Sequence, residues 1–161
     1  MRRSVEEWLD AYGESHQNPV NKRVHWVCVP LIMLSLLALL AELPAPAWVN
    51  ETLPSALQPF SHGGTLFLFV ALAYYFTLSR TLTLGMFFVS LLLLLGVETL
   101  VAIPLPRWQS ALLIFVIAWI GQFWGHHIEG KKPSFLEDIQ FLLIGPLWLL
   151  SFIYRRLGLA L

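Results

Sequence analysis

The distribution of positive charge is the feature of this sequence that most limits its fold. No Lys or Arg occurs between Arg23 and Arg80, and long apolar runs lie within and after that gap. Only 12% of the 161 residues are charged and 57% are hydrophobic, whereas a soluble domain usually has about 25% charged residues. The sequence therefore predicts an all-α membrane protein. It excludes a disordered chain, a broadly basic nucleic-acid binder and most ordinary cytosolic enzymes.

Four apolar stretches are long enough to cross a bilayer as helices, which takes about 20 residues each. We expect a single integral membrane domain, residues 1–161, with spans near 24–43, 61–79, 82–103 and 108–127. A fifth stretch, 139–157, has Gly145-Pro146 near its middle and is expected to be either a fifth span or a re-entrant helix. The expected fold is a polytopic bundle of four to five transmembrane helices.

The N-terminal segment, residues 1–18, is expected to lie at the membrane surface. Acidic residues follow the first arginines, where a cleavable signal peptide would need an apolar run. Trp8, Leu9 and Tyr12 fall on one face of a short amphipathic helix that ends at Gly13. Such a helix lies on a membrane rather than crossing it.

The positive residues also indicate the orientation. They precede the first span, separate the second from the third, and follow the fourth, as Arg2, Arg3, Lys22, Arg23, Arg80, Lys131 and Lys132. The positive-inside rule then places the N-terminus, the Arg80 turn and the Lys131 loop in the cytoplasm. We expect an integral protein of the bacterial inner (cytoplasmic) membrane.

Histidines are the most informative polar residues of this apolar chain. The expected topology brings His16, His25 and His126 to the cytoplasmic side of the membrane. His62 begins the second span at the opposite face, about 30 Å away across the hydrocarbon core, so we interpret it as an interfacial or capping residue.

A break in the chain allows His16 to approach His25. In one continuous helix the two side chains would point about 180° apart. Asn18 is expected to cap the first span and Pro19 to begin it, which leaves His16 on a loop. Asn21 and His25 are four residues apart and share one face of the helix.

A second polar stripe follows the fourth span. Its members recur at spacings of three or four residues and are Trp119, Gln122, His126 and Glu129. His127 is turned about 100° from His126 and lies off this stripe. Glu129 is placed either to be a fourth ligand or to be the carboxylate that orients a histidine.

These residues predict a metal site at the cytoplasmic end of the bundle. Its expected ligands are His16, His25 and His126, with Asn21, Gln122 and Glu129 nearby. Imidazole suits zinc, copper, iron and nickel, and three nitrogen ligands with open positions are typical of a catalytic site. The alternative is that each histidine is an interfacial residue bound to backbone groups or lipid headgroups.

Two motifs carry a resemblance to a known family. They are His16-x-Asn18-Pro19-x-Asn21-x-x-x-His25-x-x-x-x-Pro30, and Gly121-Gln122-Phe123-Trp124-Gly125-His126 followed by Glu129-Gly130-Lys131-Lys132-Pro133. Over nearly its whole length the chain resembles the small multi-span membrane family that includes the yeast 2-hydroxy fatty acid dioxygenase of phytosphingosine degradation. Many members read Gly-His-x-x-x-Glu, whereas here His126 and Glu129 are three residues apart. We match His126 to the family histidine because it follows Gly125.

The resemblance implies an Fe(2+)-dependent dioxygenase. Its substrates would be a 2-hydroxy fatty acid and dioxygen, and α-oxidation would shorten the acid by one carbon. On this interpretation the catalytic residues are His16, His25, His126 and Glu129, with Asn21 and Gln122 beside the cofactor. Two alternatives are a non-enzymatic lipid-binding or scaffold protein of the membrane, and a zinc-dependent lipid hydrolase. Membrane lipid is an expected partner, nucleic acid is not, and a homo-oligomer is compatible with the sequence.

Overall fold

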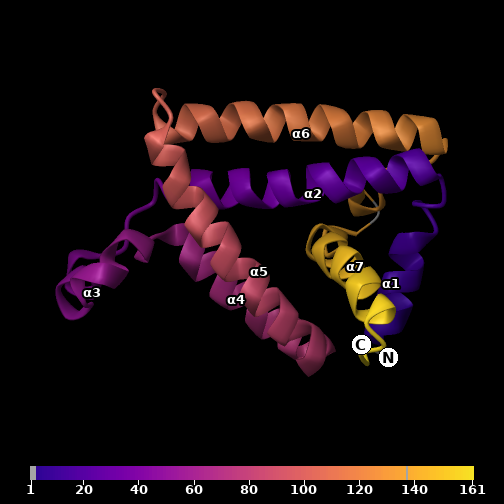
Figure 1. Cartoon of the computed structure of the whole chain (residues 1–161), viewed down its shortest axis with the longest axis horizontal. Helices are drawn as coiled ribbons and strands as arrows, with labels where there is room; N and C mark the ends of the chain where they lie inside the picture. The colour runs from indigo at the N-terminus through magenta and orange to yellow at the C-terminus, as the bar shows by residue number, and fades with distance from the viewer. Residues whose placement is uncertain (1–2, 137) are drawn as a thin grey trace.

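The computed structural model describes residues 3–136 and 138–161, and these form helices with no strands (Figure 1). The α-helices are α1 (Val5–Gly13), α2 (Pro19–Leu40), α3 (Ala47–Thr52), α4 (Gly63–Leu78), α5 (Arg80–Thr99), α6 (Arg107–Glu129) and α7 (Phe141–Arg156). Short 3-10 helices are η1 (Ser55–Phe60), η2 (Leu100–Ala102) and η3 (Ser134–Leu136). The predicted all-α class is confirmed for this part of the chain. Arg2, one of the arginines that indicate the orientation, lies outside the described residues.

Three helices are long and apolar enough to cross a membrane, which indicates a membrane protein. They are α2, α6 and the continuous run of α5 with η2, Arg80–Ala102. The apolar helix α4 has 16 residues and is shorter than a full span, and α7 also has 16 residues. The expected count of four to five spans is therefore not confirmed by the residues that the structure describes.

The helices α2 and α6 lie side by side along their length (Figure 1). Two glycines of α6 allow this close approach. A Cβ atom on Gly121 would lie 2.7 Å from the Cys28 Sγ atom, and one on Gly125 would lie 2.5 Å from the Asn21 Oδ1 atom. Small residues four apart on a membrane helix let a neighbouring backbone approach in this way. The contact brings the histidine motifs of the two helices together.

The helices α4 and α5 form a hairpin inclined to the α2–α6 pair (Figure 1). Ser79 separates them with extended backbone and caps α5 through its side chain. Two tyrosine hydroxyl groups tie the hairpin to α7. Tyr75 donates to the carbonyl oxygen of Leu143 at 2.9 Å, and Tyr154 donates to that of Thr81 at 2.9 Å. The hairpin and α7 therefore form one packed unit.

The helix α1 begins with a capping box at Ser4. Its apolar face of Trp8, Leu9 and Tyr12 is buried. The Trp8 ring packs edge-on against Phe141 of α7, with ring centroids 5.2 Å apart. The helix α7 covers this face, so the apolar residues of α1 pack within the protein.

The opposite end of the α2–α6 pair is held by polar contacts. His62 caps α4 by accepting a hydrogen bond from the Thr65 backbone amide at 3.3 Å, as its predicted capping role requires. Arg107 forms ion pairs with Glu42 at 2.9 Å and with Glu98 at 3.9 Å. These contacts involve residues remote from His16, His25 and His126.

The close α2–α6 contact can be tested at Gly121. The Gly121→Ala variant is expected to have a free energy of unfolding lower by about 1–3 kcal/mol, because the added methyl group overlaps the Cys28 sulfur atom. Thermal unfolding in detergent, followed by circular dichroism, measures the loss. In a Cys28→Ala background, where the sulfur atom is absent, Gly121→Ala should cost much less stability. An equal loss with and without the sulfur atom would contradict the proposed contact.

Candidate metal centre

The loop before α2 carries His16 back over the start of that helix. Asn18 caps α2 by accepting a hydrogen bond from the Val20 amide at 2.8 Å, and Pro19 is the first helical residue. The predicted helix start is thus confirmed. His16 and His25 are buried, with 0% and 1% of their surfaces exposed. The chain break at Asn18 is what allows these two side chains to meet.

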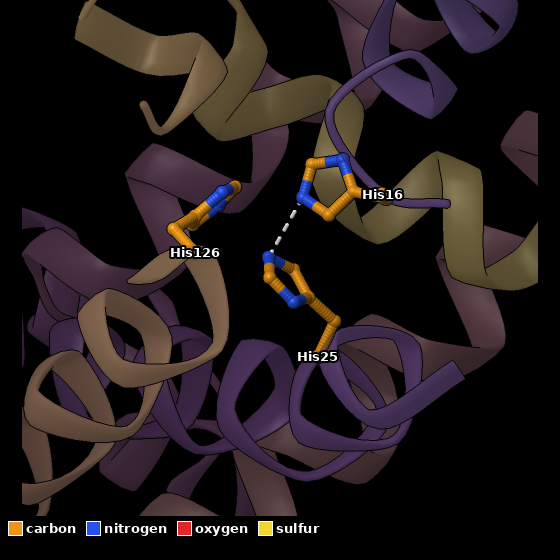
Figure 2. Close-up of side chains that lie close together, drawn as sticks. All are labelled: His16, His25 and His126. Carbon is orange, nitrogen blue, oxygen red and sulfur yellow. Dashed lines mark hydrogen bonds between the residues drawn. The ribbon is translucent and has the colours of Figure 1, made fainter. Parts of the chain in front are cut away.

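Three imidazole rings converge at this point (Figure 2). One ring nitrogen from each of His16, His25 and His126 lies within 4.8 Å of the other two. The His16 Nε2 atom is 2.8 Å from the His25 Nε2 atom. The rings come from the α1–α2 loop, from α2 and from α6. Across residues 3–136 and 138–161, this is the one group of three or more metal-ligating side chains with such spacing.

Backbone hydrogen bonds fix the tautomers of two of these rings. The His16 Nδ1 atom lies 2.5 Å from the Tyr12 carbonyl oxygen, and the His25 Nδ1 atom lies 2.9 Å from the Asn21 carbonyl oxygen. A carbonyl oxygen only accepts, so each Nδ1 donates, and each Nε2 of a neutral ring carries a lone pair. Two lone pairs that face each other at 2.8 Å require a shared positive charge, either a proton or a metal ion.

The environment of His16 disfavours the proton. Burial, followed by the neighbouring His25, lowers the pKa of His16 to about 3. The imidazole is therefore neutral at physiological pH, which is the form that binds metals. The His126 Nδ1 atom is buried and has no hydrogen-bond partner in the described part of the chain. The three rings thus fit a transition-metal ion that accepts nitrogen ligands.

Glu129 lies outside the three-histidine cluster and fastens the loop that carries His16. Its carboxylate accepts hydrogen bonds from the backbone amides of Gln17 at 2.8 Å and Asn18 at 2.9 Å, and from the Asn21 side chain at 3.0 Å. Hydrogen bonds to a carboxylate are stronger than those between neutral groups. The end of α6 is therefore joined to the start of α2 through this one side chain.

A small cavity of about 50 Å³ adjoins the histidines. His25, His126, Gln122 and Trp119 contribute to its wall. The Gln122 Oε1 and Trp119 Nε1 atoms are buried without partners among the described residues. His127, in contrast, is exposed and does not belong to the cluster. The cavity therefore combines imidazole nitrogens with an unpaired acceptor and an unpaired donor.

Sequence reasoning missed the residues that support His16. The Tyr12 ring stacks on His16 with centroids 4.2 Å apart, and Trp148 of α7 packs against the same imidazole at 5.1 Å. Ser15 lies 3.3 Å from the His16 Nδ1 atom and shares a hydrogen bond with the hydroxyl of Ser134. The four-residue spacing of Tyr12 and His16 is a local signal of their contact. No spacing relates Ser15 to Ser134 or His16 to Trp148.

The role of Glu129 can be tested with Glu129→Gln. The amide group accepts fewer hydrogen bonds than the carboxylate, so the variant is expected to lose about 1–2 kcal/mol of stability. Hydrogen exchange of the Gln17 and Asn18 amides should accelerate, because both donate to this carboxylate. The exposed neighbour His127, changed to Gln, is the control and should leave exchange unaltered. Unchanged protection in Glu129→Gln would contradict the fastening role.

One known family matches the sequence of this chain. Residues 2–157 match the family described as 2-hydroxy-palmitic acid dioxygenase Mpo1-like. No curated protein and no solved structure matches the chain significantly. The family match covers nearly the complete sequence, including both histidine motifs. The chain belongs to the Mpo1-like family of 2-hydroxy-palmitic acid dioxygenases.

Proposed function

We propose that this protein is an iron(II)-dependent dioxygenase that converts 2-hydroxy fatty acids to fatty acids one carbon shorter. The observation that carries the proposal is the convergence of three buried histidines, with the Nε2 atoms of His16 and His25 2.8 Å apart and His126 beside them. The family description, which names a 2-hydroxy-palmitic acid dioxygenase, supports the reaction. The buried histidine cluster supports a metal-dependent chemistry.

His16, His25 and His126 are the proposed ligands of the iron. Three imidazole nitrogens leave coordination positions free, as catalytic metal sites require. Ferrous iron, when bound, supplies the redox chemistry that activates dioxygen. The Tyr12 and Asn21 carbonyl oxygens orient two of the rings by accepting hydrogen bonds from their Nδ1 atoms. Such outer contacts fix the tautomer and raise the basicity of a ligating histidine.

The polar atoms of the cavity would receive the head of the substrate. The Trp119 Nε1–H group can donate to a carboxylate oxygen, and the Gln122 Oε1 atom can accept from a 2-hydroxyl group. Both lie on the same face of α6 as His126, the face that carries the predicted stripe. Glu129 acts through the loop that it holds, so it is a positioning residue in this proposal.

The proposed reaction balances with dioxygen as the oxidant. The bond between C1 and C2 breaks, C2 becomes the carboxyl carbon of the shorter acid, and C1 leaves as carbon dioxide. One molecule of water completes the balance. The electrons removed from C1 and C2 are sufficient to reduce one dioxygen molecule to the level of these products. No additional reductant is needed.

We further propose that the protein is a single integral domain of a bacterial inner membrane, with the histidines at the cytoplasmic face. The start of α2 and the end of α6 lie at the same end of that helix pair (Figure 1). On the same side, Lys131 donates a hydrogen bond to the Glu14 carbonyl oxygen at 2.8 Å. This grouping of positive segments supports the orientation that the positive-inside rule favours.

Metal analysis after anaerobic purification tests the proposed function. The protein is expected to contain one iron per chain and to consume 2-hydroxypalmitate and oxygen together, while palmitate, which lacks the hydroxyl group, is left unchanged. His25→Ala should lower metal content and reduce turnover by at least about 100-fold, because even outer contacts of metal ligands cost 10–100-fold. His127→Ala is the control and should retain both.

Three outcomes would contradict this proposal in different ways. Full activity of His25→Ala or of the metal-free protein would remove the metal from the reaction. Stoichiometric zinc without oxygen consumption would favour a lipid hydrolase. A protein that binds no metal and tolerates substitution of His16, His25 and His126 would favour a lipid-binding role.

A further inference from the structure

A second, larger cavity lies next to the small one, farther along α2 from the histidines. Its volume is about 410 Å³, and side chains of α2, α4, α5, α6 and α7 form its wall. The wall is almost entirely apolar, with contributions such as Leu37, Leu68 and Met86. A partly open cavity of this size is far larger than the packing gaps of a protein interior. It therefore calls for an apolar occupant.

The larger cavity adjoins the small one beside the histidines. The two share wall residues from three helices, namely Ile32, Met33, Trp119, Leu142 and Pro146. Along α2 the combined wall runs from His25 to Leu37, a distance of about 18 Å at the rise of an α-helix. One end holds imidazoles and unpaired polar atoms, and the other end is hydrocarbon.

A molecule with a carboxylate at one end and a long alkyl chain at the other matches this change from a polar to an apolar wall.

Two small side chains keep the apolar part open. Ala71 of α4 and Ser90 of α5 are both 4% exposed and both line the larger cavity. Leu37 and Leu68, which are also buried, stand at the end remote from the histidines.

Building on the proposed function, we propose that the larger cavity holds the alkyl tail of a long-chain 2-hydroxy fatty acid. Ala71 and Ser90 then determine which chain lengths fit, because any larger side chain at either position would occupy the path of the tail. Leu68 limits the length at the far end. Met33 and Trp119 guide the tail from the polar cavity into the apolar one, since both line the two cavities.

The tail can reach the cavity from the lipid side. Ile139, two residues before α7, and Leu142, in its first turn, belong to its wall, and 69% and 41% of their surfaces are exposed. The parts of the wall on α4 and α5, in contrast, include the buried residues Ala71, Met86 and Ser90. An alkyl chain dissolved in a bilayer therefore has an apolar route into the protein that does not cross water.

Chain-length preference in the Ser90→Phe variant of the full-length protein tests the proposal. We expect kcat/KM for 2-hydroxypalmitate to fall about 10-fold or more, within the range that pocket fit gives, while that for 2-hydroxyoctanoate stays within a factor of about two. Leu92→Phe is the matched control, since Leu92 lies on the same helix and is 70% exposed. It should leave both values unchanged.

A second variant enlarges the cavity and remains informative if Ser90→Phe does not fold. Leu68→Ala removes bulk at the far end, so it should shift the preference toward acids longer than 2-hydroxypalmitate. Unchanged preference in every folded variant would overturn the proposal. A second result would also overturn it. If a phospholipid copurifies with the wild type but not with Ser90→Phe, and the chain-length preference is unchanged, then the cavity binds membrane lipid.

Binding to metal-free protein separates this proposal from the proposed function. Calorimetry with 2-hydroxypalmitate should detect binding to the wild type and to Leu92→Phe, and binding at least about 10-fold weaker to Ser90→Phe. If the wild type turns over no acid but binds with this pattern, the dioxygenase proposal fails and the tail site stands. If turnover depends on the histidines but binding is equal in all variants, the tail site fails alone.

Discussion

The contact between α2 and α6 is the constraint on which the rest of this structure depends. His25 and His126 lie on these two helices, and their rings meet only because Gly121 and Gly125 let the backbones approach closely. A membrane offers no hydrophobic driving force between helices, so such packing relies on small residues and van der Waals contact. The approach of the His25 and His126 rings thus depends on two glycines that carry no functional group.

The third imidazole is held in a different way. His16 lies on a loop whose next two backbone amides, those of Gln17 and Asn18, donate to Glu129 of α6. The His16 ring itself stacks on Tyr12 and packs against Trp148 of α7. Two histidines therefore rest on membrane helices, whereas one depends on the N-terminal segment. Because α1 is buried against α7, that packing also sets the position of the Tyr12 carbonyl oxygen that orients the His16 ring.

Local sequence rules were sufficient to predict where α2 begins and which faces of α2 and α6 meet. The cap at Asn18 and the four-residue spacing of Asn21 and His25 are properties of short segments, so the sequence predicts them. The hydrogen bonds of Glu129 to Gln17 and Asn18 depend on how α2 and α6 cross. The spacing of Glu129 to His126 in the sequence does not indicate these partners. The larger cavity depends on the angle between helix pairs, and so residues such as Ala71 read as ordinary parts of a span.

The number of spans illustrates the same limit. Hydropathy defines the candidates but not the depth at which a shorter helix lies. The helix α4 has 16 residues, and its Tyr75 hydroxyl group is used to hold α7, whose own length is also 16 residues. Whether such helices cross depends on packing against neighbours and on local bilayer thickness. Composition alone cannot supply either quantity.

The wide separation of the histidines along the chain has a consequence for biogenesis. About one hundred residues lie between His25 and His126, and membrane helices leave the ribosome in order, from the N-terminus onward. With the proposed ligands, the nascent chain holds only two of the three histidines, His16 and His25, until α6 has been made and inserted. Iron would then be acquired only by a nearly finished polypeptide, and its capture would stabilise the fully inserted topology over any partly inserted form.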